Sequence, residues 1–126
     1  MNVTATLRAV FGLGDAAGGT DHWWGQRVTA AILAVLGIWF VGSLTTLSSF
    51  AHADVAAFIA APLNSILLSL LCVTLAYHSH LGVQVVIDDY VHAPKLNRAS
   101  IIASRIFHLL LAVVAAYALL GVGPGV

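Results

Sequence analysis

The polar side chains best suited to chemistry lie in one otherwise apolar stretch of the chain, residues 77–92. Two histidines, His78 and His80, precede two aspartates and a tyrosine at the end of this stretch. Along a helix His78 would lie about 15 Å from Asp88, near the middle of a hydrocarbon core about 30 Å thick. An imidazole at that depth is costly in lipid, so we expect His78 to have a specific partner.

The spacing around His78 suits a haem. At 100° per residue, His78, Gly82 and Asp89 share a narrow helical stripe, while His80 points to nearly the opposite side. A glycine one turn after the histidine would let the porphyrin edge lie close to the helix while the imidazole reaches the iron. Two other interpretations remain open. His78 could hydrogen-bond a Ser or Thr of a neighbouring helix, with Gly82 as a packing contact, or it could belong to a proton or metal path.

Three further residues could take part in such a site. Arg27 begins the first apolar run on the membrane side toward which the His78 stripe rises, so its guanidinium could pair with haem propionates. It could equally be a snorkelling anchor. Tyr90, beside Asp89, offers a phenol donor at the interface where a quinone headgroup would meet protons, although an aromatic belt also explains an interfacial tyrosine.

The negative charges of Asp88 and Asp89 need a compensating positive charge, because the helix dipole disfavours a carboxylate at a helix carboxyl terminus by about 0.3–1 kcal/mol each. We expect Lys95, Arg98 or Arg105 to supply it. On the next apolar run, His108 lies one turn from Arg105 and could be a second intramembrane ligand or a hydrogen-bond partner.

Catalysis by this chain alone is not expected. Cys72 is the only cysteine, so the chain supplies neither the thiolates of an iron–sulfur cluster nor a disulfide. It has no Gly-rich nucleotide loop between a strand and a helix, and no nucleic-acid partner is expected. Any catalysis must therefore be shared with other subunits.

The elements that position these residues are membrane helices. Hydrophobic residues make up 60% of the 126 residues and charged residues 8%, too few for a soluble domain of this size. We predict an all-α integral membrane protein with a cytoplasmic arm, residues 1–27, and an anchor domain, residues 28–126. Its three transmembrane helices are expected at about 28–50, 63–87 and 101–122.

Finer predictions concern the helix ends and the loops. The third helix is expected to begin at Asn97 or Ser100, both good N-caps. Residues 52–61 are expected to form an interfacial loop that is partly helical. Because His and Gln at membrane depth need partners that lipid does not offer, we expect the three helices to be half of a heterodimeric anchor bundle.

The cationic residues lie on one side of the predicted membrane topology. They precede the first span or surround the loop between the second and third: Arg8, Arg27, Lys95, Arg98 and Arg105. The positive-inside rule places the amino terminus and this loop in the bacterial cytoplasm, or in the matrix if the chain is mitochondrial. We therefore predict a multi-pass protein of the bacterial inner membrane.

These residues resemble a known family, the hydrophobic membrane-anchor subunits of succinate dehydrogenase, respiratory complex II. The resemblance is carried by residues 27–30, Arg-Val-Thr-Ala, and by His78 with Gly82 four residues on and the Asp89-Tyr90-Val91 sequence beyond it. It covers the entry to the first helix and all of the second.

The resemblance implies specific roles. His78 would be an axial ligand of the iron of haem b, shared with a second membrane-anchor subunit of cytochrome b type, with Arg27 near the propionates. Tyr90 would donate a hydrogen bond to ubiquinone, with Asp89 as its polar neighbour. An iron–sulfur subunit, and through it a flavoprotein subunit, would deliver electrons from succinate in the tricarboxylic acid cycle and respiratory chain. The alternative function is a small oligomeric proton or metal-ion conductor lined by His78, His80 and His108.

Overall fold

The computed structural model describes residues 19–122, and these form helices joined by short connections. The helices are α2 (Gly19–Leu44), α3 (His52–Ala60), α4 (Pro62–Tyr90) and α5 (Pro94–Val122). The described range contains no strand. Three of the helices are long and apolar enough to cross a membrane: 25 residues of α2 and all 29 residues of α4 and of α5. The prediction of an all-α membrane protein with three spans is confirmed.

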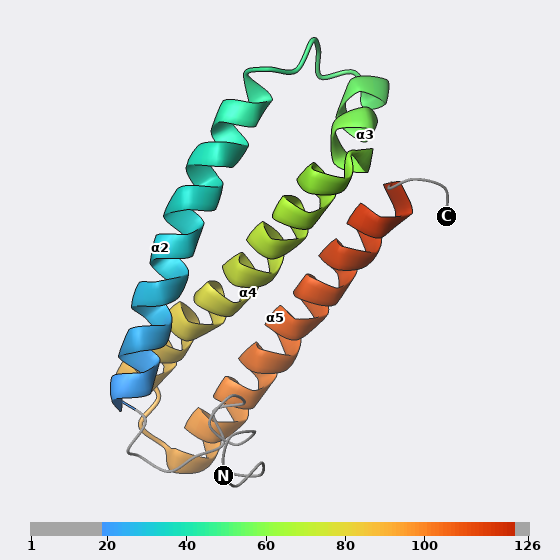
Figure 1. The fold of residues 1–126 in the computed structure, drawn as a ribbon. Coiled ribbons are helices and arrows are strands. Elements are labelled where there is room, and N and C mark those ends of the chain that lie inside the picture. The colour runs from blue at the N-terminus through green and yellow to red at the C-terminus, as the bar shows by residue number, and fades with distance from the viewer. Residues whose placement is uncertain (1–18, 123–126) are drawn as a thin grey trace, which may run out of the picture.

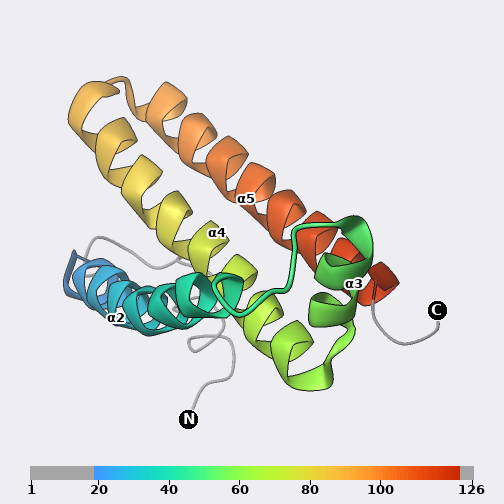
Figure 2. The same cartoon turned by 90° about the horizontal axis from the view of Figure 1, so that it is seen from above.

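The helix α4 is the centre of the arrangement. It packs against α2 on one side and against α5 on the other, whereas the backbones of α2 and α5 do not approach each other closely within residues 19–122. Figure 1 shows α2 diverging from α4 toward the end that carries α3, and Figure 2 shows α2 and α5 on either side of α4. The amino end of α2 therefore lies beside the carboxyl end of α4 and the amino end of α5, where residues 77–92 are found.

Little apolar surface is buried within the chain. Only three hydrophobic side chains of the described range are buried, namely Leu36, Leu68 and Leu81. Large apolar residues elsewhere on the helices are open, such as Val35 at 70% and Ile38 at 76% exposure. This surface must be covered by lipid or by another protein.

The first long helix is displaced relative to the apolar run that predicts it. It is already helical from Gly19, well before Val28, so residues 19–27 are part of α2, while residues 1–18 lie outside the described range. It ends at Leu44, and the side chains of the next two residues bond to carbonyl groups of its last turn. The side chains of Thr45 and Thr46 donate hydrogen bonds to the carbonyls of Gly42 and Ser43, at 2.6 and 2.7 Å, and such local bonds compete with helix continuation.

The prediction that the third helix begins at Asn97 or Ser100 is wrong. The helix α5 begins at Pro94, whose fixed φ and missing N–H suit a first helical position. Asn97 lies in the first turn of α5, and its side chain bonds to residues that precede the helix. Its side-chain amide donates to the Val91 carbonyl at 3.1 Å and to Asp88 Oδ1 at 3.0 Å. Asn97 therefore fastens the α4–α5 connection instead of starting the helix.

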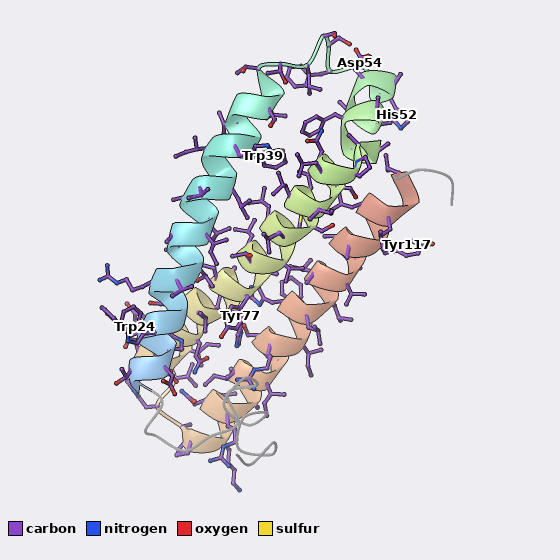
Figure 3. All side chains as sticks on the ribbon, in the orientation of Figure 1. Trp24, Trp39, His52, Asp54, Tyr77 and Tyr117 are labelled. Atoms are coloured by element: carbon purple, nitrogen blue, oxygen red, sulfur yellow. The ribbon has the colours of Figure 1, made fainter. Side chains whose placement is uncertain are left out.

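The stretch expected to be a partly helical loop is the nine-residue helix α3. It lies at the far end of the molecule from residues 77–92, where Figure 3 shows His52 and Asp54. Its Phe58 ring stacks on Trp39 of α2, with centroids 6.3 Å apart. The Asn64 side chain of α4 donates a 2.9 Å bond to the Phe58 carbonyl. These contacts tie α3 to α2 and α4, and its backbone also packs against α5.

Candidate functional site

His78 makes a hydrogen bond across the α2–α4 interface. Its Nδ1 lies 2.7 Å from the hydroxyl oxygen of Thr29. The same hydroxyl lies 2.6 Å from the carbonyl of Gly25, one turn earlier on α2, and has a single proton to donate. Because that carbonyl can only accept, the pattern is satisfied when Thr29 donates to Gly25 and His78 Nδ1–H donates to Thr29. This tautomer leaves a lone pair on Nε2 of His78.

The second nitrogen of His78 is open. Within residues 19–122, Nε2 has no hydrogen-bond partner, and the side chain is only partly buried. Gly82 follows one turn later on the same face, and an added Cβ there would have nothing within 4 Å among the described residues. Gly82 therefore packs against no other helix in residues 19–122, and the space beside it can accept a flat ring. The face formed by His78 and Gly82 fits a haem bound through Nε2.

The structure shows part of the alternative in which His78 hydrogen-bonds a Ser or Thr of a neighbouring helix. The bond to Thr29 exists, but it occupies Nδ1 and leaves Nε2 unused. The described residues contain no group of three or more His, Cys, Asp or Glu side chains that could hold a bare metal ion.

The other two intramembrane histidines lie in the α4–α5 interface. His80 Nδ1 lies 3.1 Å from the hydroxyl of Ser104. His108 Nδ1 lies 2.7 Å from the Ser104 carbonyl, and its Nε2 lies 3.1 Å from the Ser79 hydroxyl. Both nitrogens of His108 are therefore engaged. Of the two roles expected for His108, the structure shows the hydrogen-bond partner.

His80 differs from His78 in its surroundings. It faces α5, as the 100° spacing predicts, and is only 5% exposed, packed with its ring centroid 5.8 Å from that of His108. A porphyrin could not reach its ring without separating α4 from α5. The three histidines that would line the alternative ion conductor are thus divided between two interfaces. His78 faces α2, and His80 and His108 lie between α4 and α5.

Arg27 lies on the surface of α2, with its guanidinium carbon 5.1 Å from the centroid of the Trp23 ring. That ring in turn meets Trp24 edge to face at 5.1 Å, at the end of α2 where Figure 3 labels Trp24. The cation–π contact holds Arg27 beside an aromatic pair suited to the membrane interface. The structure does not bring Arg27 into contact with His78 or Gly82 within residues 19–122.

The carboxyl end of α4 presents Asp89 and Tyr90 to the surroundings. Both are exposed, and the Tyr90 side chain is 80% exposed. Asp88 is instead held by the side-chain amide of Asn97 at 3.0 Å. Asp88 thus has an amide donor that the sequence analysis did not anticipate, and compensation by a cation stays a prediction. The phenol of Tyr90 is open to a ligand outside this chain.

The sequence interpretation missed Thr29 and Ser104. Each is a hydroxyl residue in an apolar helix that bonds a histidine of α4. The available signal was the rule that polar side chains at membrane depth seek partners on neighbouring helices. It does not say which hydroxyl meets which ring, because that depends on how the helices cross.

Comparisons with known proteins agree on one family. Residues 1–120 match the family model described as succinate dehydrogenase/fumarate reductase transmembrane subunit. The chain is 39% identical over 100 residues to a succinate dehydrogenase hydrophobic membrane anchor subunit of Rickettsia bellii, covering 77% of this chain and 78% of the relative. It is 30% identical over 125 residues to the subunit of that name from Paracoccus denitrificans, and the match covers 99% of this chain and 96% of the relative. A succinate dehydrogenase membrane anchor subunit of Reclinomonas americana is 31% identical over 91 residues, and the match covers 70% of this chain and 76% of the relative.

Proposed function

Since the chain belongs to the succinate dehydrogenase/fumarate reductase transmembrane subunit family, we propose that it anchors a succinate:quinone oxidoreductase to the membrane and supplies part of its haem b and quinone sites. It is non-catalytic alone and acts as one member of the complex. The observation that carries the haem assignment is the open Nε2 of His78, with Nδ1 held by Thr29 and open space at Gly82.

In this proposal His78 is one axial ligand of haem b, and the other comes from a second anchor subunit. His78 and Gly82 lie near the end where α2 and α4 pack together, and the open space beside Gly82 supports a partner there. When bound, haem b would supply a one-electron store. Arg27, which lies beside Trp23 in this chain, would hold the haem propionates through its guanidinium.

Tyr90 and Asp89 serve the quinone. Reduction of a quinone to a quinol takes two electrons and two protons, so the site must lie where water can supply protons. Tyr90 ends α4 and is 80% exposed, which suits a hydroxyl that donates a hydrogen bond to a quinone carbonyl. Asp89, its exposed neighbour, keeps this end of the helix polar and hydrated.

The charge distribution supports an orientation. The amino end of α2, the carboxyl end of α4 and the amino end of α5 meet at one end of the molecule (Figure 1), and Arg27, Lys95 and Arg98 lie there. By the positive-inside rule this end faces the cytoplasm of a bacterium. The iron–sulfur protein, with the flavoprotein behind it, then docks on the face that carries Tyr90.

The proposal is tested by purifying the complex from native membranes with an affinity tag on this chain. We expect the flavoprotein, the iron–sulfur protein and a second hydrophobic subunit to co-purify, with the absorption spectrum of a bis-histidine haem. Iron-free protein that purifies as an oligomer of this chain alone and conducts ions in liposomes would instead support the His-lined conductor. Co-purification of the other subunits without haem would restrict the function to that of a structural anchor.

A further inference from the structure

We propose that Thr29 is a positioning residue for the haem ligand, which fixes the tautomer and ring orientation of His78 so that Nε2 carries its lone pair toward the iron. This inference rests on the proposed role of His78. It assigns to the first span a part in the site that goes beyond packing.

The Thr29 hydroxyl is held in a defined direction. The side chain is only 7% exposed, and its oxygen lies 2.6 Å from the Gly25 carbonyl and 3.2 Å from the Gln26 carbonyl. Both carbonyls only accept hydrogen bonds, so the hydroxyl proton is used within α2. What the oxygen offers to α4 is a lone pair, and its partner at 2.7 Å must be a donor.

That donor is Nδ1–H of His78. A neutral imidazole has one protonated nitrogen, so binding the proton at Nδ1 leaves Nε2 as the ligand atom. Hydrogen bonding at the remote nitrogen also makes the ligand nitrogen more electron-rich and holds the ring plane. Thr29 therefore prepares His78 for iron before any haem is bound.

A close approach of the two helices makes this bond possible. A Cβ added to Gly25, one turn before Thr29, would lie 3.3 Å from Leu81 Cδ1 and 3.7 Å from the Tyr77 hydroxyl. A side chain at Gly25 would therefore require the buried Leu81 side chain to give way. The glycine thus allows the helix spacing that brings a short threonine side chain within reach of His78.

The test compares two substitutions in the purified complex. Thr29→Val keeps the shape and removes the hydroxyl, whereas Thr29→Ser keeps the hydroxyl. Haem retention is measured as transfer to apomyoglobin, normalised to the flavoprotein in the assembled fraction, and the haem midpoint potential is measured by redox titration. We expect Thr29→Val to weaken haem retention about 10–100-fold, the range typical of lost outer-shell partners.

We also expect Thr29→Val to raise the midpoint potential, because a less electron-rich imidazole stabilises ferric iron less. Thr29→Ser should match the wild type in both measurements. Equal retention and an equal potential in all three proteins would overturn the role of Thr29. The His78→Ala variant distinguishes a wrong role for Thr29 from a wrong haem ligand. If His78→Ala keeps a bis-histidine haem, the assignment of His78 as ligand is wrong. If His78→Ala loses the haem while Thr29→Val behaves as wild type, only the role of Thr29 is wrong.

Discussion

At the scale of single residues, the membrane histidines are distinguished by which ring nitrogens remain open and by how much room surrounds them. His108 uses both nitrogens within the chain, and His80 is enclosed between α4 and α5. His78 uses one nitrogen and presents the other beside a glycine. The sequence shows three similar residues, whereas hydrogen bonding and burial together leave His78 as the one accessible candidate ligand among the three.

Tyr90 provides a prediction with a matched control. Tyr90→Phe removes one hydroxyl, and we expect it to lower succinate-to-quinone electron transfer about tenfold, equivalent to about 1.4 kcal/mol of transition-state stabilisation. Succinate oxidation by an artificial dye should stay at the wild-type rate, because the dye does not need the quinone site. Both rates are measured on the same purified complex.

Tyr117→Phe is the control, since Tyr117 is 79% exposed but lies near the other end of the molecule, on α5 (Figure 3). It should leave both rates unchanged. If Tyr90→Phe reduces the dye and quinone activities equally, Tyr90 acts on assembly and not on the quinone.

At the scale of elements, α4 carries two polar seams on opposite sides. The seam toward α2 is the Thr29–His78 bond, and the seam toward α5 consists of Ser79, His80, Ser104 and His108. In the α5 seam both nitrogens of His108 are bonded, while His80 is bonded through Nδ1 only and its ring is enclosed between the two helices, which suits a joint between them. The α2 seam leaves an open nitrogen, which suits a ligand.

Removing the central hydroxyl of the α5 seam tests its structural role. Ser104 Oγ lies 3.1 Å from His80 Nδ1 and 3.3 Å from His108 Nδ1. We expect Ser104→Ala to lower the free energy of unfolding in mixed detergent by about 0.6 kcal/mol and at most about 1.7 kcal/mol, the measured range for hydrogen bonds in membranes. The haem spectrum should not change.

Ser100→Ala, one turn earlier on the same helix, serves as the control, because no hydrogen bond joins its side chain to another described residue. It should unfold like the wild type. A Ser104→Ala complex with unchanged stability but an altered haem spectrum would place the cofactor on the α5 side and contradict the division between the two seams.

The sequence predicts the three spans because apolar run length is a strong signal, and it predicts that His78 and His80 face opposite sides because helical periodicity is fixed. It fails at the start of α5, where Pro94 precedes both expected caps. It also fails to identify Thr29 and Ser104 as partners, since pairing across helices depends on crossing angle and axial register. The roles of Arg27, Gly82, Asp89 and Tyr90 stay predictions, because they concern groups outside this chain.

At the scale of the whole molecule, the chain is an open arrangement and not a closed bundle. The central helix α4 touches both neighbours, α2 and α5 stay apart in the described range, and few side chains are buried. His78 is partly buried where α2 and α4 pack together, Gly82 is exposed beside it on α4, and the exposed end of α4 carries Tyr90. Both candidate sites thus lie where another protein of the complex would complete them.

The most direct test of this account is the absorption spectrum of the intact complex carrying His78→Ala, compared with the matched change His80→Ala. Both remove one imidazole from α4, two residues apart. We predict that the bis-histidine haem bands are lost or strongly altered in the His78→Ala complex and retained in the His80→Ala complex. Retention of the bands in His78→Ala together with their loss in His80→Ala would contradict the assignment of the haem ligand.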